Sequence, residues 1–141
     1  MNETLKHRFA ALPAVGIEHE LQLERGSVRD YAALCEHHYR AKRPATVTRV
    51  LALRHDRPTV SGRFVGVRGQ SRVIGVLVES LAALNCRLRD FALSGRYGEW
   101  RNASHRARVL NAELRCISRV VVHPQWRGLG LAVRLVRASL D

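Results

Sequence analysis

The chain has 141 residues, of which 46% are hydrophobic and 26% are charged, with 24 Lys and Arg against 12 Asp and Glu. This size and composition are typical of one globular domain, and no run approaches the ~20 apolar residues that a transmembrane helix needs. The net charge of +12 favours an anionic partner, either nucleic acid or an anionic cofactor. Arginines spread along the whole chain fit a compositional bias of the coding genome equally well.

Residues 1–16 are predicted to form an N-terminal extension, in which residues 2–12 are compatible with a short helix that ends at Pro13. Charges among the first nine residues argue against a signal peptide. Three widely separated cysteines, without a Cys-x-x-Cys pair, indicate neither a disulfide framework nor a zinc site. Reduced thiols favour a cytoplasmic location.

Alternating apolar residues predict one strand over residues 17–23 and another over residues 47–55. Between them, Ser27 to Asp30 resembles a capping box and predicts a helix from residue 27 to about residue 39. His37 and His38 are adjacent on that helix, so their side chains point about 100° apart and are not expected to share a metal ion. No metal site is predicted elsewhere.

Two apolar runs, residues 64–67 and 73–78, flank a short glycine-containing link and predict a β-hairpin. The second run is almost entirely apolar, so we expect a central strand buried on both faces. Gly75 within this run predicts a bulge or the close approach of another element.

Residues 81–112 are predicted to be an Arg-rich insertion. A helix-compatible stretch at 84–93 and a loop at 94–98 precede a helix over 103–110, which Asn102 caps and whose Arg106 and Arg108 are expected to face solvent. The insertion is either a surface excursion that covers the edge of the sheet or a lid that binds substrate or nucleic acid by stacking and phosphate contacts. We favour the surface excursion.

The last segment is predicted to be a strand over residues 113–122, a turn with two glycines, and an amphipathic helix over residues 129–140. The first amides of a helix have no intrahelical acceptor and lie at the positive end of its dipole. Glycines allow an anion to approach the backbone closely. The sequence therefore predicts an anion site at Gly128 and Gly130.

The pattern Arg127-x-x-Gly130-x-Ala132 follows a β-branched strand, His123-Pro124 and Trp126. In this order the segment resembles the pyrophosphate loop of the GNAT family, the Gcn5-related N-acetyltransferases. The resemblance implies an α/β (α+β) fold with a mixed, mainly antiparallel central sheet flanked by helices. Residues 17–141 would form a partial domain that lacks the last strands and helix of that fold, and we expect the chain to be C-terminally truncated.

The resemblance implies an acyl-CoA-dependent N-acyltransferase that transfers an acetyl group from acetyl-CoA to an unidentified amine. Glu79, Glu113 and His123 are candidates for the general base, but no motif marks a catalytic residue. The cofactor site implied by the family comprises strand and loop residues: Val120, Val121, Val122, Arg127, Gly128, Leu129, Gly130, Leu131, Ala132 and Val133.

The alternative is a non-catalytic or fragmentary module of the same fold that binds nucleic acid or a partner subunit. The net charge and the Arg-rich insertion motivate it. Residues 43–46, 84–86 and 115–124 also resemble, less securely, an acetyltransferase module associated with ABC-type ATPases, which implies such an ATPase as a possible partner.

Overall fold

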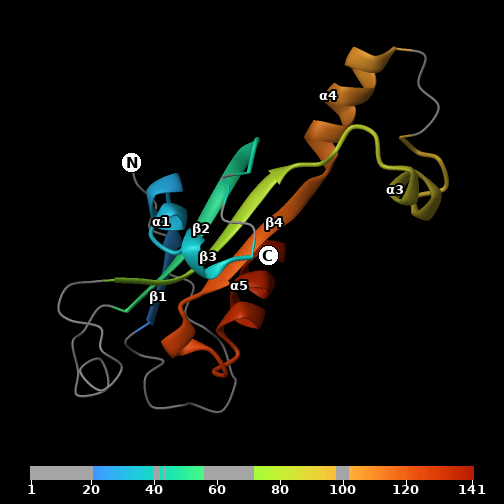
Figure 1. Cartoon of the computed structure of the whole chain (residues 1–141). Coiled ribbons are helices and arrows are strands. Elements are labelled where there is room, and N and C mark those ends of the chain that lie inside the picture. Colours follow the sequence, from blue (N-terminus) through green and yellow to red (C-terminus); the bar gives the residue numbers. More distant parts are fainter. Residues whose placement is uncertain (1–20, 40–41, 43, 56–71, 98–101) are drawn as a thin grey trace.

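A single antiparallel sheet organises the chain. The computed structural model describes residues 21–39, 42, 44–55, 72–97 and 102–141. Four strands follow one another in the sheet in chain order: β1 (Leu21–Arg25), β2 (Val47–His55), β3 (Arg72–Leu81) and β4 (Arg115–Val122). Each strand pairs antiparallel with its neighbour in sequence. The prediction of an α+β fold with an antiparallel sheet flanked by helices is therefore confirmed (Figure 1).

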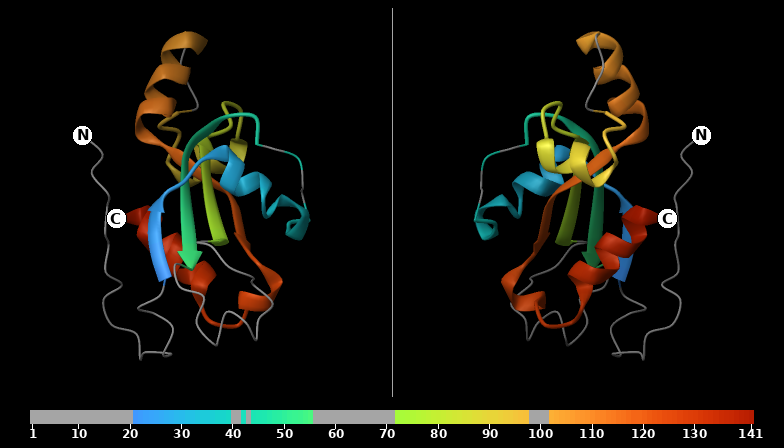
Figure 2. Two further views of the ribbon diagram at one scale, coloured as in Figure 1. Left: turned by 90° about the vertical axis from the view of Figure 1, so that its left-hand side faces the viewer. Right: turned by 90° about the vertical axis from the view of Figure 1, so that its right-hand side faces the viewer.

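Helices cover both faces of this sheet. The helix α1 (Val28–Ala32) and the 3₁₀ turn η2 (Cys35–His37) lie on one face, and α5 (Leu131–Leu140) lies on the other (Figure 2). Neighbouring residues of a strand point to opposite faces, so the strands supply two separate cores. The α5 side buries Leu21, Leu23, Leu51, Leu53, Leu77 and Val122, and the α1 side buries Val50, Val76, Val78 and Val121.

Strand β3 is central and buried from Ile74 to Ser80, as its apolar sequence predicted. Leu53 pairs with Gly75 whereas Arg54 pairs with Val73, so Ile74 is the extra residue of a bulge. A Cβ atom on Gly75 would lie 3.2 Å from Cδ1 of Leu135 in α5. Both predictions for this glycine region, a bulge and a close approach, are confirmed.

The predicted continuous helix over residues 27–39 is wrong. The capping interaction is present, because the amide of Ser27 donates to Oδ2 of Asp30 at 2.6 Å. The helix nevertheless ends at Ala32, since Leu34 adopts φ −120° and ψ −2° and buries its side chain on the sheet. A helix of five residues gains little from propagation, so the packing of one leucine can end it.

Other predicted boundaries shift, and some lie outside the described residues. Strand β1 continues to Arg25, beyond the predicted end at residue 23. Residues 1–20, which include the predicted extension and the start of that strand, are outside the described part of the chain, as is the strand predicted over 64–67. The helix α5 begins at Leu131 instead of residue 129, because Gly130 has φ +71° and caps it.

The insertion forms an arm, which we define as residues 82–97 and 102–114. It contains α3 (Arg87–Ala92) and α4 (Ala103–Glu113) and projects beyond the end of the sheet (Figure 1). Leu81 pairs with Arg115, so the arm leaves and rejoins the sheet at adjacent positions. The expectation that the insertion covers the edge of the sheet is wrong. The arm also lies at the start of β4, at the opposite end of that strand from the glycine turn, so it is no lid on that turn.

Details within the arm also differ from expectation. The cap is confirmed, since Oδ1 of Asn102 accepts from the amide of His105 at 3.0 Å. The helix α4 extends to Glu113, which was predicted to lie in the returning strand. The guanidinium of Arg106 donates to the carbonyl of Leu84 and its side chain is only 20% exposed, so the prediction that it faces solvent is wrong.

Candidate functional site

The connection between β4 and α5 is anchored at both ends by buried contacts. The amide of His123 donates to the carbonyl of Ile74 at 2.8 Å and extends the pairing of β4 with β3. Trp126, at the end of the 3₁₀ turn η3 (Pro124–Trp126), is 2% exposed and packs with α5 residues in the core. The loop that follows is thus held at a fixed place at the end of the sheet.

This loop presents its backbone to open space. Gly128 and Gly130 have φ +84° and +71°, the left-handed conformation that glycine adopts without strain. A Cβ atom at either position would meet no atom within 4 Å. An approaching ligand could therefore reach the backbone at both glycines.

The first turn of α5 adds amides without an intrahelical acceptor beside these glycines. The amide of Arg134 donates to the carbonyl of Gly130 at 3.2 Å, which closes the first turn of the helix. The amides of Leu131, Ala132 and Val133 belong to that turn and have no intrahelical acceptor. The structure thus brings the predicted loop residues Gly128 to Val133 together at the positive end of the α5 dipole.

Strand β4 is an edge strand within the described part of the chain. Because the amide of His123 points to β3, the backbone groups of Val121 also point to β3, and those of Val120 and Val122 point to the outer edge. Of the three predicted valines, Val120 and Val122 are therefore placed to pair with an extended ligand. The polar backbone groups of Val121 belong to the existing ladder.

Arg127 holds the loop in place through two hydrogen bonds. Its Nε donates to the carbonyl of Val122 at 3.1 Å, and its second guanidinium nitrogen donates to the carbonyl of His37 at 3.2 Å. The guanidinium therefore joins η2 to the end of β4. The family resemblance places Arg127 in the cofactor site, whereas in this structure its guanidinium donates to two carbonyls.

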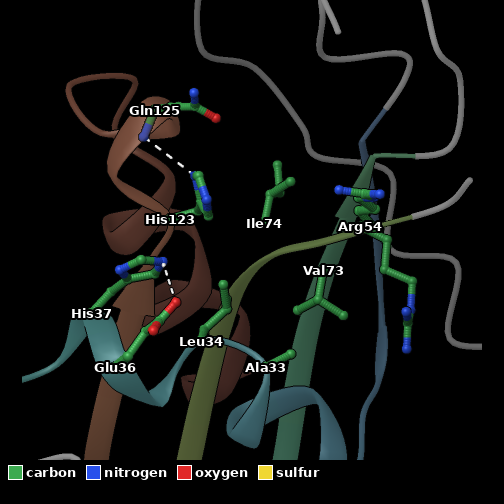
Figure 3. Close-up of a pocket in the computed structure, with 10 residues that line it drawn as sticks. Ala33, Leu34, Glu36, His37, Arg54, Val73, Ile74, His123 and Gln125 are labelled. Atoms are coloured by element: carbon green, nitrogen blue, oxygen red, sulfur yellow. Dashed lines mark hydrogen bonds and ion pairs between the residues drawn. The ribbon is translucent and has the colours of Figure 1, made fainter. Parts of the chain in front are cut away.

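A cavity of about 390 Å³ lies close to Arg127, between η2 and the ends of β3 and β4 (Figure 3). The rings of His37 and His123 meet edge to face with 5.0 Å between their centroids. The carboxylate of Glu36 lies 3.7 Å from Nε2 of His37. The remaining lining comes from β2, β3, η3 and the link between α1 and η2, and comprises Ala33, Leu34, Arg54, Arg72, Val73, Ile74 and Gln125.

The surroundings of His123 favour its neutral form. Burial, and then the positive charges of His37 and Arg127, lower the pKa of His123 below its ordinary value, while Glu36 opposes the shift. Its Nδ1 accepts a hydrogen bond from the amide of Gln125 at 3.3 Å. The neutral ring therefore carries its proton on Nε2 and acts as a donor.

The other two candidate bases are held elsewhere by structural partners. The carboxylate of Glu79 binds the guanidinium of Arg49, which also donates to the carbonyl of Ser139 near the end of α5. Glu113 accepts from the hydroxyl of Tyr97 and pairs with Arg96 in the arm. Neither carboxylate lines the cavity, so the structure brings only His123 close to the loop.

Sequence reasoning missed the cavity residues Glu36, Arg54 and Arg72. Arg54 and Arg72 become neighbours because His55 pairs with Arg72 in the register of β2 and β3. Strand alternation can be read from the sequence, but this register cannot, because residues 56–71 separate the two strands. The proximity of these two arginines therefore cannot be predicted without that pairing.

Within the described ranges no three His, Cys, Asp or Glu side chains are grouped so that they could hold a metal ion. No helix among the described residues is long and apolar enough to cross a membrane. Comparisons of the chain with protein-family models, with curated proteins and with solved structures found no match.

Proposed function

We propose that this chain is an acyl-CoA-binding module of GNAT-like fold that acts in the transfer of an acetyl group from acetyl-CoA to an amine. The observation that supports the proposal most is the continuity of an outward-facing strand edge with an open glycine loop and a helix N-terminus. A long ligand with an amide-containing arm and a pyrophosphate requires these features in this order. Few other ligands combine both groups.

Different residues of this chain would bind the pantetheine arm and the pyrophosphate of acetyl-CoA. Val120 and Val122 offer backbone groups at the outer edge of β4 to the amides of the pantetheine arm. The amides from Gly128 to Val133 suit the pyrophosphate, for which a helix N-terminus is worth about 0.3–1 kcal/mol and each further charged hydrogen bond adds to it. Arg127 must leave the carbonyl of Val122 if a ligand is to pair there.

In the proposed reaction an amine attacks the thioester carbonyl carbon of acetyl-CoA, so that a C–N bond forms, the C–S bond breaks, and the proton lost by the amine passes to the leaving thiolate. The attacking amine must be neutral, and a donor can orient the acceptor by binding another of its polar groups, which leaves the lone pair of the amine free. His123 fits the second role, because its Nδ1 is already occupied by the amide of Gln125 and its Nε2 carries the proton. The cavity beside His123 is our candidate for the acceptor pocket. The three free cysteines agree with a cytoplasmic setting for this reaction.

The decisive experiment compares Gly130→Val with Gly95→Val by calorimetric titration of acetyl-CoA. Both glycines have φ above +70° and open space around a Cβ atom, so the two variants carry similar backbone strain. Only Gly130 belongs to the loop. We expect the Gly95 variant to bind acetyl-CoA like the unmodified chain and the Gly130 variant to lose binding.

Circular dichroism shows whether each variant is folded, so that loss of binding can be assigned to the loop. Equal affinity in the unmodified chain and a folded Gly130→Val variant would refute the assigned cofactor site. If the folded unmodified chain shows no heat of binding, the proposed function is refuted for this chain.

A further inference from the structure

The arm carries an apolar surface with no cover among the described residues. Leu88 and Phe91 in α3 are 80% and 86% exposed, and Leu84 and Leu93 beside the helix are also exposed. Leu88 and Phe91 are three residues apart in α3 and therefore lie on one face of the helix, and Leu84 and Leu93 lie just outside its two ends. We call these four residues the arm face. None of them lies near the glycine loop, which is at the far end of β4 (Figure 1).

Two of the three polar residues of α3, Arg89 and Asp90, are turned inward, whereas its large apolar side chains are exposed, which is the reverse of an ordinary surface helix. The guanidinium of Arg89 donates to the carbonyls of Ala83 and Leu84 and pairs with Asp90. Arg106 of α4 donates to the carbonyl of Leu84 and lies 3.7 Å from Asp90. Hydrogen bonds and ion pairs therefore fix α3 on the arm, while its apolar side chains point away.

The charge beside the arm face is positive. Arg87 precedes Leu88, lies one helical turn from Phe91 and is exposed, with no ion pair to a described residue. The two acidic residues of the described arm are already engaged, Asp90 with arginines and Glu113 with Tyr97 and Arg96. A partner that covers the arm face therefore meets exposed positive charge at its border.

We propose that the arm face is a docking site for an acidic amphipathic helix of another protein. The apolar side of such a helix would cover Leu88 and Phe91, and one of its carboxylates would pair with Arg87. A second copy of this chain fits poorly, because each copy carries a net charge of +12.

Other anionic partners fit less well than an acidic helix. Single-stranded nucleic acid binds exposed aromatic rings by stacking, whereas three of the four residues of the arm face are leucines. A membrane-surface helix needs several free cations on its polar side, whereas one of the two arginines of α3, Arg89, is used inside the arm and only Arg87 is left exposed. The docking site does not depend on the proposed acyl-CoA site.

The test uses a fluorescein-labelled helical peptide of about 18 residues, or five turns, with Leu along one side and Glu on the others. A scrambled peptide of the same composition and a peptide with Lys in place of Glu are the controls. Fluorescence anisotropy is measured with the full chain, with Leu88→Gln/Phe91→Gln, with Arg87→Gln and with Leu140→Gln. Leu140 is 76% exposed on α5 and is the matched control.

We expect the full chain to bind the Leu/Glu peptide saturably and neither control peptide. The double variant should weaken binding at least about tenfold, because central apolar contacts dominate such interfaces. Arg87→Gln should weaken it about threefold, and Leu140→Gln should leave it unchanged. Equal binding by the double variant, binding of the scrambled peptide, or no saturable binding would overturn the proposal.

Three parallel measurements decide between occupants. Sedimentation of the full chain detects self-association, and titrations with phosphatidylserine vesicles and with oligo-dT detect the other two anionic partners. If one of these interactions is stronger than peptide binding and is lost in Leu88→Gln/Phe91→Gln, the arm face serves that occupant and the proposal is wrong. Peptide binding lost in the double variant, with none of the three affected, would support it.

Discussion

His123 shows how neighbours set the chemistry of a single residue. Its pKa is lowered by burial first and then by the positive charges of His37 and Arg127. A folded state that disfavours protonation binds fewer protons than the unfolded chain below the ordinary pKa of 6.5. The free energy of unfolding should therefore fall as the pH drops below about 6.5 and should be fully retained above it.

Urea unfolding at a series of pH values measures this effect. In His123→Asn an amide oxygen can replace Nδ1 as the acceptor for Gln125, but the residue no longer titrates. As the pH falls from 7 to 5, we expect the free energy of unfolding to decrease more for the unmodified chain than for this variant. A difference that is constant over this range would contradict the assignment.

The contact between the imidazoles of His37 and His123 leads to a second prediction. Replacing His37 by Gln removes one of the charges that lower the pKa of His123, so that pKa should rise. NMR titration of the histidine ring protons measures it. His38→Gln is the matched control, because the His38 ring stacks on Tyr39 and not on His123. Equal titration of His123 in both variants would refute the coupling.

Local residue roles could be predicted from the sequence, and long-range ones could not. The caps at Ser27 and Asn102 depend on partners three residues away, so a short pattern reveals them. Arg127 binds a carbonyl 90 residues away, which no pattern indicates. Glu79 looked like a candidate base for the same reason, because its partner Arg49 lies 30 residues away in another strand.

A buried ion pair helps to attach α5 to the sheet. Arg49 binds Glu79 in β3 and the carbonyl of Ser139 near the end of α5, and the Glu79 side chain is only 8% exposed. Arg49→Met would leave this carboxylate without its cation and should lower the free energy of unfolding by about 3 kcal/mol. Urea unfolding measures the loss.

The double variant Arg49→Met/Glu79→Met separates the ion pair from other effects. Because it leaves no buried charge, it should lose clearly less stability than Arg49→Met alone. If the stability loss of the double variant equals the sum of the losses of Arg49→Met and Glu79→Met, the two side chains do not interact energetically. The helix content from circular dichroism should stay the same in every variant.

Elements with a strong period were predicted best. The alternation in β2 and the amphipathic pattern of α5 place both elements within two residues of their observed bounds. The helix predicted after Ser27 failed because tertiary packing of Leu34 outweighed a weak helical pattern. The two helices of the arm were largely predicted, but the position of the arm relative to the sheet was not. That position depends on polar contacts between residues distant in sequence, such as Arg106 with Leu84.

The charge of the whole molecule predicts how salt affects it. With a net charge of +12, repulsion among arginines outweighs a few local ion pairs such as that of Arg54 with Asp30. Raising sodium chloride from about 0.1 M to about 1 M shortens the Debye length from roughly 10 Å to roughly 3 Å. The melting temperature should therefore rise, as measured by scanning calorimetry. A fall would mean that the local pairs dominate.

The paired ends of β3 and β4 have a consequence for how the chain folds. Since Leu81 lies opposite Arg115, pairing these strands requires closure of the whole arm as one loop, whose entropic cost grows with the logarithm of its length. Replacing residues 82–114 by a four-residue turn would shorten that loop about eightfold and reduce the cost by roughly 2 kcal/mol. The arm therefore slows the formation of the sheet, and the shortened chain should fold faster than the full one.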